Sequence, residues 1–360
     1  MLKPGHFFLL GLVVALAGCA TKPRRADGTV PDWQDGYVDT SHFEPIPMQP
    51  SPGSSVMPQR PALQWPQSSA ESWITLERWC QMNRLGYPMR QASVTATYLV
   101  NTPNGILKLR SGSRVAQWNG MDLQLGFPPR EVGDRLLVHV LDARKNFQPL
   151  VETLTLPPAG GRTIVVDPGH GGGNTGTRSV YNQTFEKEYT LDWALRLKPL
   201  LEANGWRVLL TRTNDVEVPL GDRVAFAEQH HADLFVSLHF NAAGSGQEQA
   251  GAETYCVTPK GMPSNLTRDY EDDSAKTFPN NAFDTQNLQY ALRLQRALLT
   301  ISGQRDRGVR RARFMGVLLG QNRPAVLLEA GFLSNPTEAA RVADPVFRQD
   351  LAQAVADALR

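Results

Sequence analysis

Cysteine is scarce in this sequence. Only three cysteines occur in 360 residues, and after Cys19 only Cys80 and Cys256 remain, far apart along the chain. They do not indicate the disulfide framework of a small secreted domain, so the fold must depend on packing. The motifs CxxC, HExxH and GxSxG are absent. Their absence excludes thioredoxin-like, zincin-type and serine-hydrolase interpretations.

No charge of one sign dominates the chain, and no hydrophobic run is long enough to cross a bilayer. The 37 Lys and Arg residues nearly balance the 35 Asp and Glu residues, for a net charge of +2. This balance does not mark the chain as a nucleic-acid binder, so any charged partner must be recognised locally. The apolar run over residues 7–16 is too short for a membrane span.

The amino terminus has the pattern of an export signal. Lys3 precedes the apolar run over residues 7–16, which ends in the small-residue sequence LAGC at Cys19. LAGC resembles the bacterial lipobox, in which the chain is cut before the cysteine and the thiol receives a lipid. Since Ala20 follows, we expect an exported protein with a signal peptide over residues 1–18, anchored at the periplasmic face of the outer membrane. A plain signal peptide with an incidental cysteine is the alternative.

Composition divides the rest of the chain into three parts. Residues 19–70 are rich in Pro, Ser and polar residues and contain too little apolar sequence for a core, which predicts a tether. Residues 71–158 contain short alternating apolar runs broken by Asn, Pro and Gly, which predict a small β-rich accessory domain opened by a helix. We assign no chemistry to this domain. Residues 161–360 form the third part.

In residues 161–360, strand and helix patterns alternate. This alternation predicts an α/β domain with a mostly parallel central sheet and helices on both faces. The small β-rich domain precedes it in the chain. A helix with leucines along one face is expected over residues 186–205, where Gly205 ends it. Further helices are expected over residues 221–232, 286–301 and 336–360. Strands are expected over residues 163–167, 206–212, 233–239, 252–258 and 324–330.

Three of these apolar strands run into reactive residues, namely His170, His239 and Glu329, and Glu186 opens the helix after the first strand. The carboxyl ends of strands in an open α/β sheet border the ligand crevice, so these side chains can converge. His170, Glu186 and His239 form a His₂Glu set, which suits Zn²⁺ with a fourth position for water. Taken singly, each His has a structural alternative, and Glu186 has one in the helix dipole.

Five motifs, in this order, carry a family resemblance: VVDPGHGG, TFEKEYTL, ADLFVSLHFNA, DRGVRRARF and PAVLLEAGFLSNP. They resemble those of the zinc-dependent N-acetylmuramoyl-L-alanine amidases of bacteria, over residues 162–360. The resemblance implies a zinc ion on His170, Glu186 and His239, with Glu329 as catalytic base. It also implies peptidoglycan as the substrate, cut at the amide between N-acetylmuramic acid and L-alanine.

Other interpretations remain beside this one. A non-catalytic peptidoglycan-binding protein on the same fold, or a zinc peptidase acting on the stem peptide, has a similar pattern. Residues 171–176 also form GxGxxG, as in dinucleotide-binding loops, but Pro168 and His170 intrude and no helix follows immediately. Phe240 departs from the family pattern, which often has a small residue after the third ligand.

The basic segment 305–313 has two interpretations. It is either a solvated surface or a site where arginines bind carboxylates of the peptide stem. We name Arg310, Arg311 and Asn241 as candidate substrate-binding residues. Nucleic acid is not an expected partner of an exported protein. The stretch over residues 259–284 is short and polar, so the sequence does not imply a protein activator.

Overall fold

The computed structural model describes most of the chain after the predicted tether. The predicted signal peptide, Cys19 and the predicted tether lie outside the described residues. Within the described residues, no helix is both long and apolar enough to cross a membrane. The described segments are residues 72–91, 96–243, 247–266 and 272–360.

The first region is β-rich and contains the expected opening helix. Strand β1 (Trp73–Thr75) leads into α1 (Leu76–Met82), whose N-cap Thr75 accepts a hydrogen bond from the Arg78 amide at 3.1 Å. In β4 (Gly105–Arg110), Leu107 and Leu109 are buried while their neighbours are more exposed, as strand alternation requires. The remaining elements are β2 (Met89–Gln91), β3 (Thr97–Thr102), β5 (Val115–Trp118), β6 (Met121–Gln124), β7 (Arg130–Val132), β8 (Arg135–His139), α2 (Val140–Asp142), η3 (Ala143–Phe147) and α3 (Gln148–Val151).

The second region is an α/β fold, which confirms the predicted class. Its strands lie in the order β10-β9-β11-β14-β12-β13, and the first four are parallel. Strand β12 is antiparallel to β14 and parallel to β13. The strand bounds are β9 (Thr163–Pro168), β10 (Arg207–Leu210), β11 (Leu234–Asn241), β12 (Ala252–Val257), β13 (Asp306–Ala312) and β14 (Ala325–Phe332).

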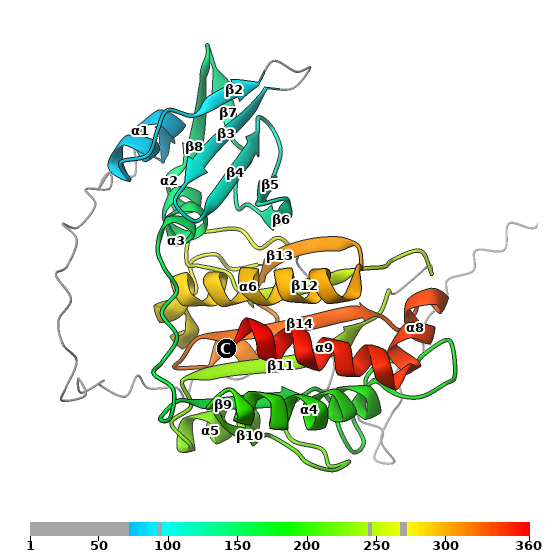
Figure 1. The fold of residues 1–360 in the computed structure, drawn as a ribbon. Coiled ribbons are helices and arrows are strands. Elements are labelled where there is room, and N and C mark those ends of the chain that lie inside the picture. Colours follow the sequence, from blue (N-terminus) through cyan, green and yellow to red (C-terminus); the bar gives the residue numbers. More distant parts are fainter. Residues whose placement is uncertain (1–71, 92–95, 244–246, 267–271) are drawn as a thin grey trace, which may run out of the picture. The chain divides into compact units, whose positions relative to one another are not determined.

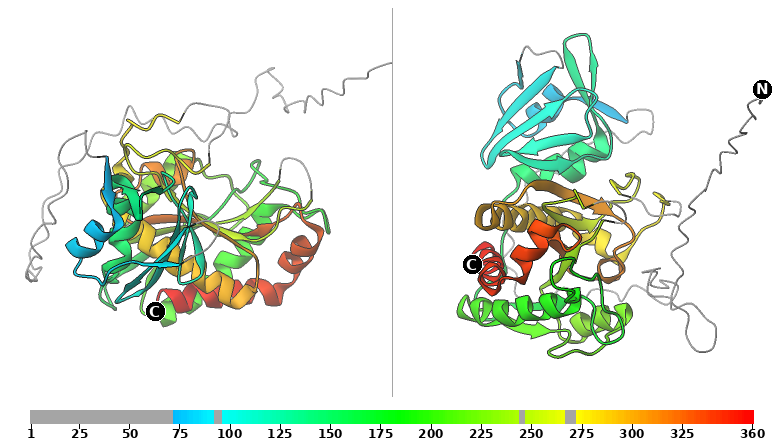
Figure 2. Two further views of the ribbon diagram at one scale, coloured as in Figure 1. Left: turned by 90° about the horizontal axis from the view of Figure 1, so that it is seen from above. Right: turned by 90° about the vertical axis from the view of Figure 1, so that its right-hand side faces the viewer.

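Helices cover both faces of this sheet (Figures 1 and 2). On one face lie α4 (Glu186–Ala203), α6 (Asp284–Ser302) and α9 (Pro345–Ala358), and α9 packs against the other two. On the opposite face, α5 (Leu220–Gln229) packs against α7 (Gly316–Leu319). Helix α8 (Pro336–Ala343) follows β14 and contacts α9, and η4 (Pro279–Phe283) precedes α6.

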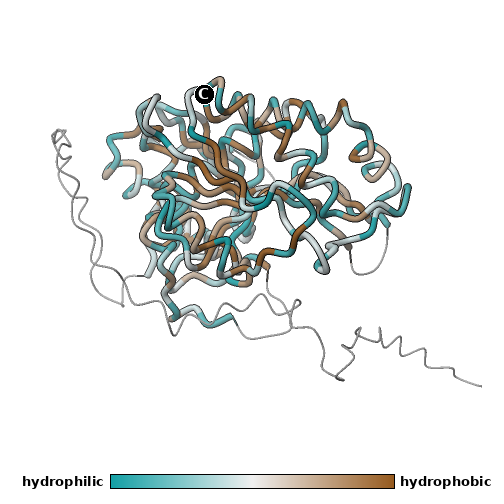
Figure 3. The backbone as a smooth tube through the Cα atoms, turned by 90° about the horizontal axis from the view of Figure 1, so that it is seen from below, coloured by the Kyte–Doolittle hydropathy of each residue, from teal (hydrophilic) through white to brown (hydrophobic). Residues whose placement is uncertain are grey.

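The central strands are buried on both sides, which explains their continuous apolar sequences. Alternate residues of β9 enter different clusters: Ile164 packs in the same cluster as Trp193 of α4, whereas Val165 and Phe235 share a cluster with Ala227 of α5. Figure 3 shows the resulting apolar band through the middle of the molecule. The sheet is therefore the shared wall of two cores.

Part of the β-rich region continues the same sheet in the order β13-β6-β5-β4-β3-β2, whereas β1, β8 and β7 form a separate sheet. Strand β6 pairs with β13 at Leu123 and Val309, and the Asp122 amide donates to Asp306 Oδ2 at 2.6 Å. Gly308 lies in the left-handed region at φ 84°, and a Cβ there would lie 2.7 Å from the carbonyl oxygen of Asp122. Only glycine permits this approach without a shift of the backbone.

Most of the basic segment 305–313 forms strand β13, over Asp306–Ala312, which was not predicted from the sequence. Arg311 is only 1% exposed, and its guanidinium donates to the Lys145 carbonyl at 2.8 Å and to Asn146 Oδ1 at 3.1 Å. Arg313 is buried as well. The interpretation of Arg311 as a substrate ligand is therefore corrected, because its guanidinium is buried and both Nη atoms donate inside the protein. The same burial excludes a purely solvated basic surface.

We predict that Arg311→Leu destabilises the protein by about 1–3 kcal/mol, because the buried acceptors on Lys145 and Asn146 lose their donor. Denaturant unfolding of both proteins measures this difference. Arg305→Leu is the matched control, since Arg305 is exposed, and it should change stability by less than about 0.5 kcal/mol. Equal stability of the two variants would contradict the structural role of Arg311.

Candidate metal centre

His170 lies just beyond β9 in an unusual backbone conformation. Its φ is 64°, in the left-handed region that few residues other than glycine adopt. Two buried arginines hold this loop by its carbonyl oxygens. Arg223 Nη2 donates to the His170 carbonyl at 2.7 Å, and Arg212 Nη2 donates to the Gly169 carbonyl at 2.8 Å. The backbone strain at His170 is therefore balanced by bonds from outside the loop.

Asp167 fixes Arg223 in turn. It is fully buried and forms a 2.6 Å ion pair with Arg223, and it accepts hydrogen bonds from Thr211 and Ser237 at 2.5 and 2.7 Å. Burial alone raises the pKa of Asp167, but Arg223 and the hydroxyl donors outweigh burial and bring this pKa below its ordinary value. Asp167 therefore stays ionised at neutral pH.

Glu186 is the first residue of α4, where the helix dipole favours a carboxylate. It is buried, and backbone amides hold both its oxygens: Thr177 N donates to Oε2 and Phe240 N donates to Oε1, each at 3.0 Å. The Phe240 ring packs against Trp193, with centroids 5.5 Å apart. The bulky residue at position 240 is thus accommodated in the core.

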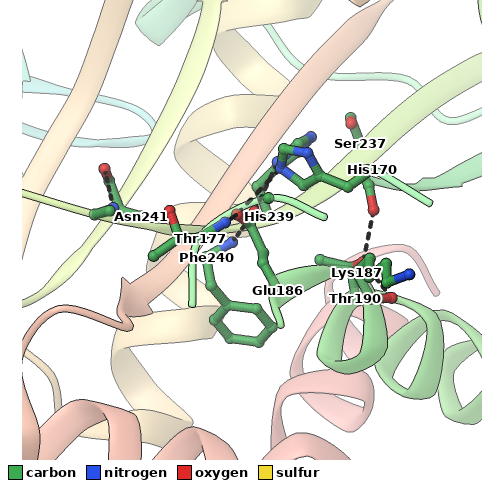
Figure 4. Close-up of polar contacts among 12 residues, drawn as sticks. His170, Thr177, Glu186, Lys187, Thr190, Ser237, His239, Phe240 and Asn241 are labelled. Atoms are coloured by element: carbon green, nitrogen blue, oxygen red, sulfur yellow. Dashed lines mark hydrogen bonds and ion pairs between the residues drawn. The ribbon is translucent and has the colours of Figure 1, made fainter. Parts of the chain in front are cut away.

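His239 in β11 completes a three-residue cluster (Figure 4). Its Nδ1 lies 3.0 Å from Glu186 Oε1, and His170 Nε2 lies 3.1 Å from Glu186 Oε2. The three possible ligand atoms all lie within 4.8 Å of one another. The structure therefore brings together the three residues that the sequence analysis names as metal ligands.

The charge states of Glu186 and His239 suit a cation. Burial raises the pKa of Glu186, but the neighbouring imidazoles of His170 and His239 lower it by more. The net shift of this pKa is strongly downward. Burial lowers the pKa of His239, whereas at His170 the Glu186 carboxylate outweighs burial and raises the pKa. An ionised carboxylate and a neutral imidazole are the forms that bind a metal.

Two glycines leave the room that this arrangement needs. A Cβ at Gly169 would lie 2.3 Å from His239 Cε1, and a Cβ at Gly176 would lie 2.6 Å from Glu186 Oε2. Any side chain at either position would displace one of the cluster residues. The set of two imidazoles and one carboxylate, packed this closely, fits a zinc ion with an open position.

Asn174 orients His170 from outside the cluster. Its Oδ1 lies 2.7 Å from His170 Nδ1, which places the ring proton on Nδ1 and leaves Nε2 directed at Glu186. Asn174, Arg212 and Arg223 were not predicted from the sequence. Isolated Asn and Arg residues carry no signal of their own in a single sequence, because their partners lie on other elements.

Glu329 lies in β14, on the strand next to His239. In the register of the sheet, Glu329 is paired with His239 of β11 on one side and with Glu253 of β12 on the other. Its side chain is half-buried. The proposed base thus belongs to the strand that borders the metal cluster, and its role remains a prediction.

The other two candidate substrate residues contact a carboxylate that the sequence analysis did not name. Asn241 Nδ2 donates to Glu253 Oε1 at 2.6 Å, and Arg310 Nε lies 2.9 Å from Glu253 Oε2. Asn241 and Arg310 therefore meet at Glu253, whereas Arg311 does not join them.

Comparison with known proteins adds the family. The profile of a family described as N-acetylmuramoyl-L-alanine amidase matches residues 164–360. This chain belongs to that amidase family. His170, Glu186, His239 and Glu329 all lie within the matched segment, whereas the β-rich region lies before it.

Two curated relatives of this amidase-family protein illustrate the match. The probable cell wall amidase LytH of Staphylococcus epidermidis is 35% identical over 213 residues, which is 59% of this chain and 62% of that protein. The N-acetylmuramoyl-L-alanine amidase LytC of Bacillus subtilis is 34% identical over 200 residues, which is 56% of this chain and 35% of that protein. This chain thus spans less than two thirds of the length of either relative.

Solved structures of similar sequence are amidases as well. An N-acetylmuramoyl-L-alanine amidase from Clostridium difficile 630 is 29% identical, with a TM-score of 0.46, and the match covers 56% of this chain and 96% of that chain. The catalytic domain of CwlV from Bacillus (Paenibacillus) polymyxa is 31% identical, with a TM-score of 0.45, and the match covers 55% of this chain and 96% of that chain.

We predict that Asn174→Leu weakens zinc binding by about 10- to 100-fold, the usual effect of removing a hydrogen bond to a ligating histidine. Competition with a chelator of known affinity measures the change. Asn174→Asp keeps an acceptor oxygen near His170 Nδ1 and should retain most of the affinity. If the Leu variant held zinc as tightly as the parent, the orienting role of Asn174 would be wrong.

Proposed function

We propose that this protein hydrolyses the amide bond between N-acetylmuramic acid and L-alanine in peptidoglycan. The observation that carries the proposal is the convergence of His170, Glu186 and His239 inside the segment that matches the amidase family. The relatives bear the names of amidases, which supports the same reaction. Because the match covers only part of each relative, an experiment must identify the substrate of this chain.

In this proposal His170, Glu186 and His239 hold a zinc ion. When bound, Zn²⁺ polarises a carbonyl and lowers the pKa of water to about 7. Glu329 accepts the proton of the attacking water and passes it to the departing amine. Asn174 holds His170 at the correct angle, and the amides of Thr177 and Phe240 hold Glu186.

Two alternatives give different products. A zinc peptidase would cut inside the stem peptide, and a non-catalytic binding protein would release nothing. Mass analysis of sacculi treated with the zinc-loaded protein distinguishes the three, because only the amidase yields glycan free of peptide. Cut peptide still attached to the glycan would replace the proposed reaction with the peptidase reaction.

We further propose that the protein is exported and anchored by a lipid on Cys19. The support comes from the sequence alone: the LAGC motif, the short apolar run before it and the tether of residues 19–70. The composition of residues 19–70 predicts a coil, and a coil of about fifty residues has a root-mean-square reach on the order of 40 Å. Such a tether allows an anchored enzyme to work on a nearby layer of cell wall.

We predict that Glu329→Gln separates catalysis from metal binding. The variant keeps the size of the side chain but cannot accept a proton, so turnover should fall by about 10²- to 10⁴-fold while zinc content stays near that of the parent. Glu186→Gln should instead lose zinc to chelators, because an anionic ligand is removed. Metal analysis and sacculus digestion, run on the same samples, measure both effects.

The opposite pattern of metal content would reverse the two roles. If Glu329→Gln lost its zinc while Glu186→Gln kept it, Glu329 would be the ligand and Glu186 the base. Full activity in both variants would refute the hydrolase proposal.

We predict that Cys19→Ser releases the protein from membranes without loss of zinc or activity, because Cys19 precedes the tether and lies far in sequence from the cluster. Fractionation of cells without detergent, with the parent protein as control, measures the distribution. Continued membrane association of the variant would count against lipid anchoring.

A further inference from the structure

A buried carboxylate beside the cluster holds two arginines. Glu253 of β12 is only 2% exposed, and its Oε2 lies 3.0 Å from Arg307 Nε and 2.9 Å from Arg310 Nε. Its Oε1 accepts hydrogen bonds from Tyr255 Oη at 2.8 Å and from Asn241 Nδ2 at 2.6 Å. Three hydrogen bonds and the ion pair with Arg310 therefore fix this carboxylate, and Arg310 Nε also donates to the Arg307 carbonyl at 3.2 Å.

A bulge in β13 makes this pairing possible. Residues three apart on a regular strand point to opposite faces of the sheet. The register with β12 shifts between Ala252, which faces Asp306, and Thr254, which faces Val309, so one extra residue enters β13 near Gly308. Arg307 and Arg310 thus reach the same carboxylate, although strict alternation would separate them.

The arginine pair carries more charge than its anchor neutralises. The single negative charge of Glu253 offsets one of the two guanidinium charges. Both arginines contact Glu253 through Nε, so their Nη atoms take no part in this contact. The side chains of Arg307 and Arg310 are 18% and 19% exposed. Arg307 also stacks on the Phe332 ring, 4.7 Å from its centroid, which restrains its guanidinium plane. Glu329 lies on the next strand, beside the three residues that would hold a zinc cation.

The pair lies within reach of a substrate at the metal cluster. His239, Glu329 and Glu253 occupy neighbouring register positions on three adjacent strands. Adjacent strands are about 4.7–4.9 Å apart, so Glu253 lies roughly 10 Å from His239 along the sheet. An extended peptide covers about 3.3–3.6 Å per residue. A residue close behind the scissile amide therefore reaches the guanidinium groups.

We propose that Arg307 and Arg310, held by Glu253, bind a carboxylate of the peptide that follows the scissile amide. Guanidinium groups recognise carboxylates through paired donors, and partial burial strengthens the contact. In this arrangement Asn241 supports Glu253 and does not itself bind the substrate. The inference rests on the proposed amidase function, because it concerns the part of the amidase substrate that Arg307 and Arg310 recognise.

The test measures binding, so that it does not depend on turnover. Two probes are compared: N-acetylmuramoyl-L-alanyl-D-glutamate, and the same compound with both glutamate carboxyls amidated. Calorimetry with zinc-loaded Glu329→Gln protein should show the acid binding at least about tenfold more tightly than the amide. In that background, Arg307→Gln and Arg310→Gln should each reduce the preference severalfold. Arg305→Gln, which removes an exposed charge just before β13, should leave it unchanged.

Two further measurements keep the test decisive if a Gln variant fails to fold. Arg310→Lys keeps a cation beside Glu253 but loses the planar pair of donors, so it should give an intermediate preference. With both arginines intact, raising the salt concentration should weaken acid binding much more than amide binding. The arginine proposal is overturned if the preference for the acid persists in both Gln variants. It is also overturned if the parent background shows no preference.

The two proposals fail in different ways. If the protein with Glu329 intact prefers the acid but releases no peptide from sacculi, the amidase proposal is wrong and the carboxylate site stands. If that protein cleaves sacculi while acid and amide bind equally, the amidase proposal stands and the arginine pair serves only to neutralise Glu253.

Discussion

The ion pair between Asp167 and Arg223 is the constraint on which the candidate site depends. Both side chains are buried, and removing one partner of such a pair typically costs about 3–5 kcal/mol because the other charge is left uncompensated. The pair is part of the site as well as of the core. Arg223 also donates to the carbonyl oxygens of Pro168 and His170. A buried ion pair therefore holds the loop in which His170 has its left-handed conformation.

Close approach is the second constraint, and it explains the glycines around His170. The amino end of α4 brings Glu186 against the loop, and β11 brings His239 against the same loop from the other side. Gly169 and Gly176 stand where any Cβ would overlap these side chains. Three elements distant in sequence can converge on one point only where the backbone between them carries no side chain.

Strand β13 joins the β-rich region to the neighbourhood of the site. Arg311 is buried against Lys145 and Asn146 of the β-rich region, whereas Arg310 is paired with Glu253 beside Glu329. One short strand thus has structural contacts on one face and the charged cluster on the other. The β-rich region therefore supports the position of the strand that carries the arginine pair.

The alternation of apolar segments by itself determined the α/β class, and local motifs singled out the three residues that the fold brings together as a candidate metal site. Strand β13 was not predicted, because its arginines interrupt the apolar alternation that indicates a strand. The partners of these arginines lie on other elements. Only the tertiary structure decided which of those arginines is buried and which contact Glu253. The bulge at Gly308 turns Arg307 and Arg310 toward Glu253 and leaves Arg311 on the buried face. The direction of a side chain at a bulge depends on pairing with neighbouring strands, which a single sequence does not record.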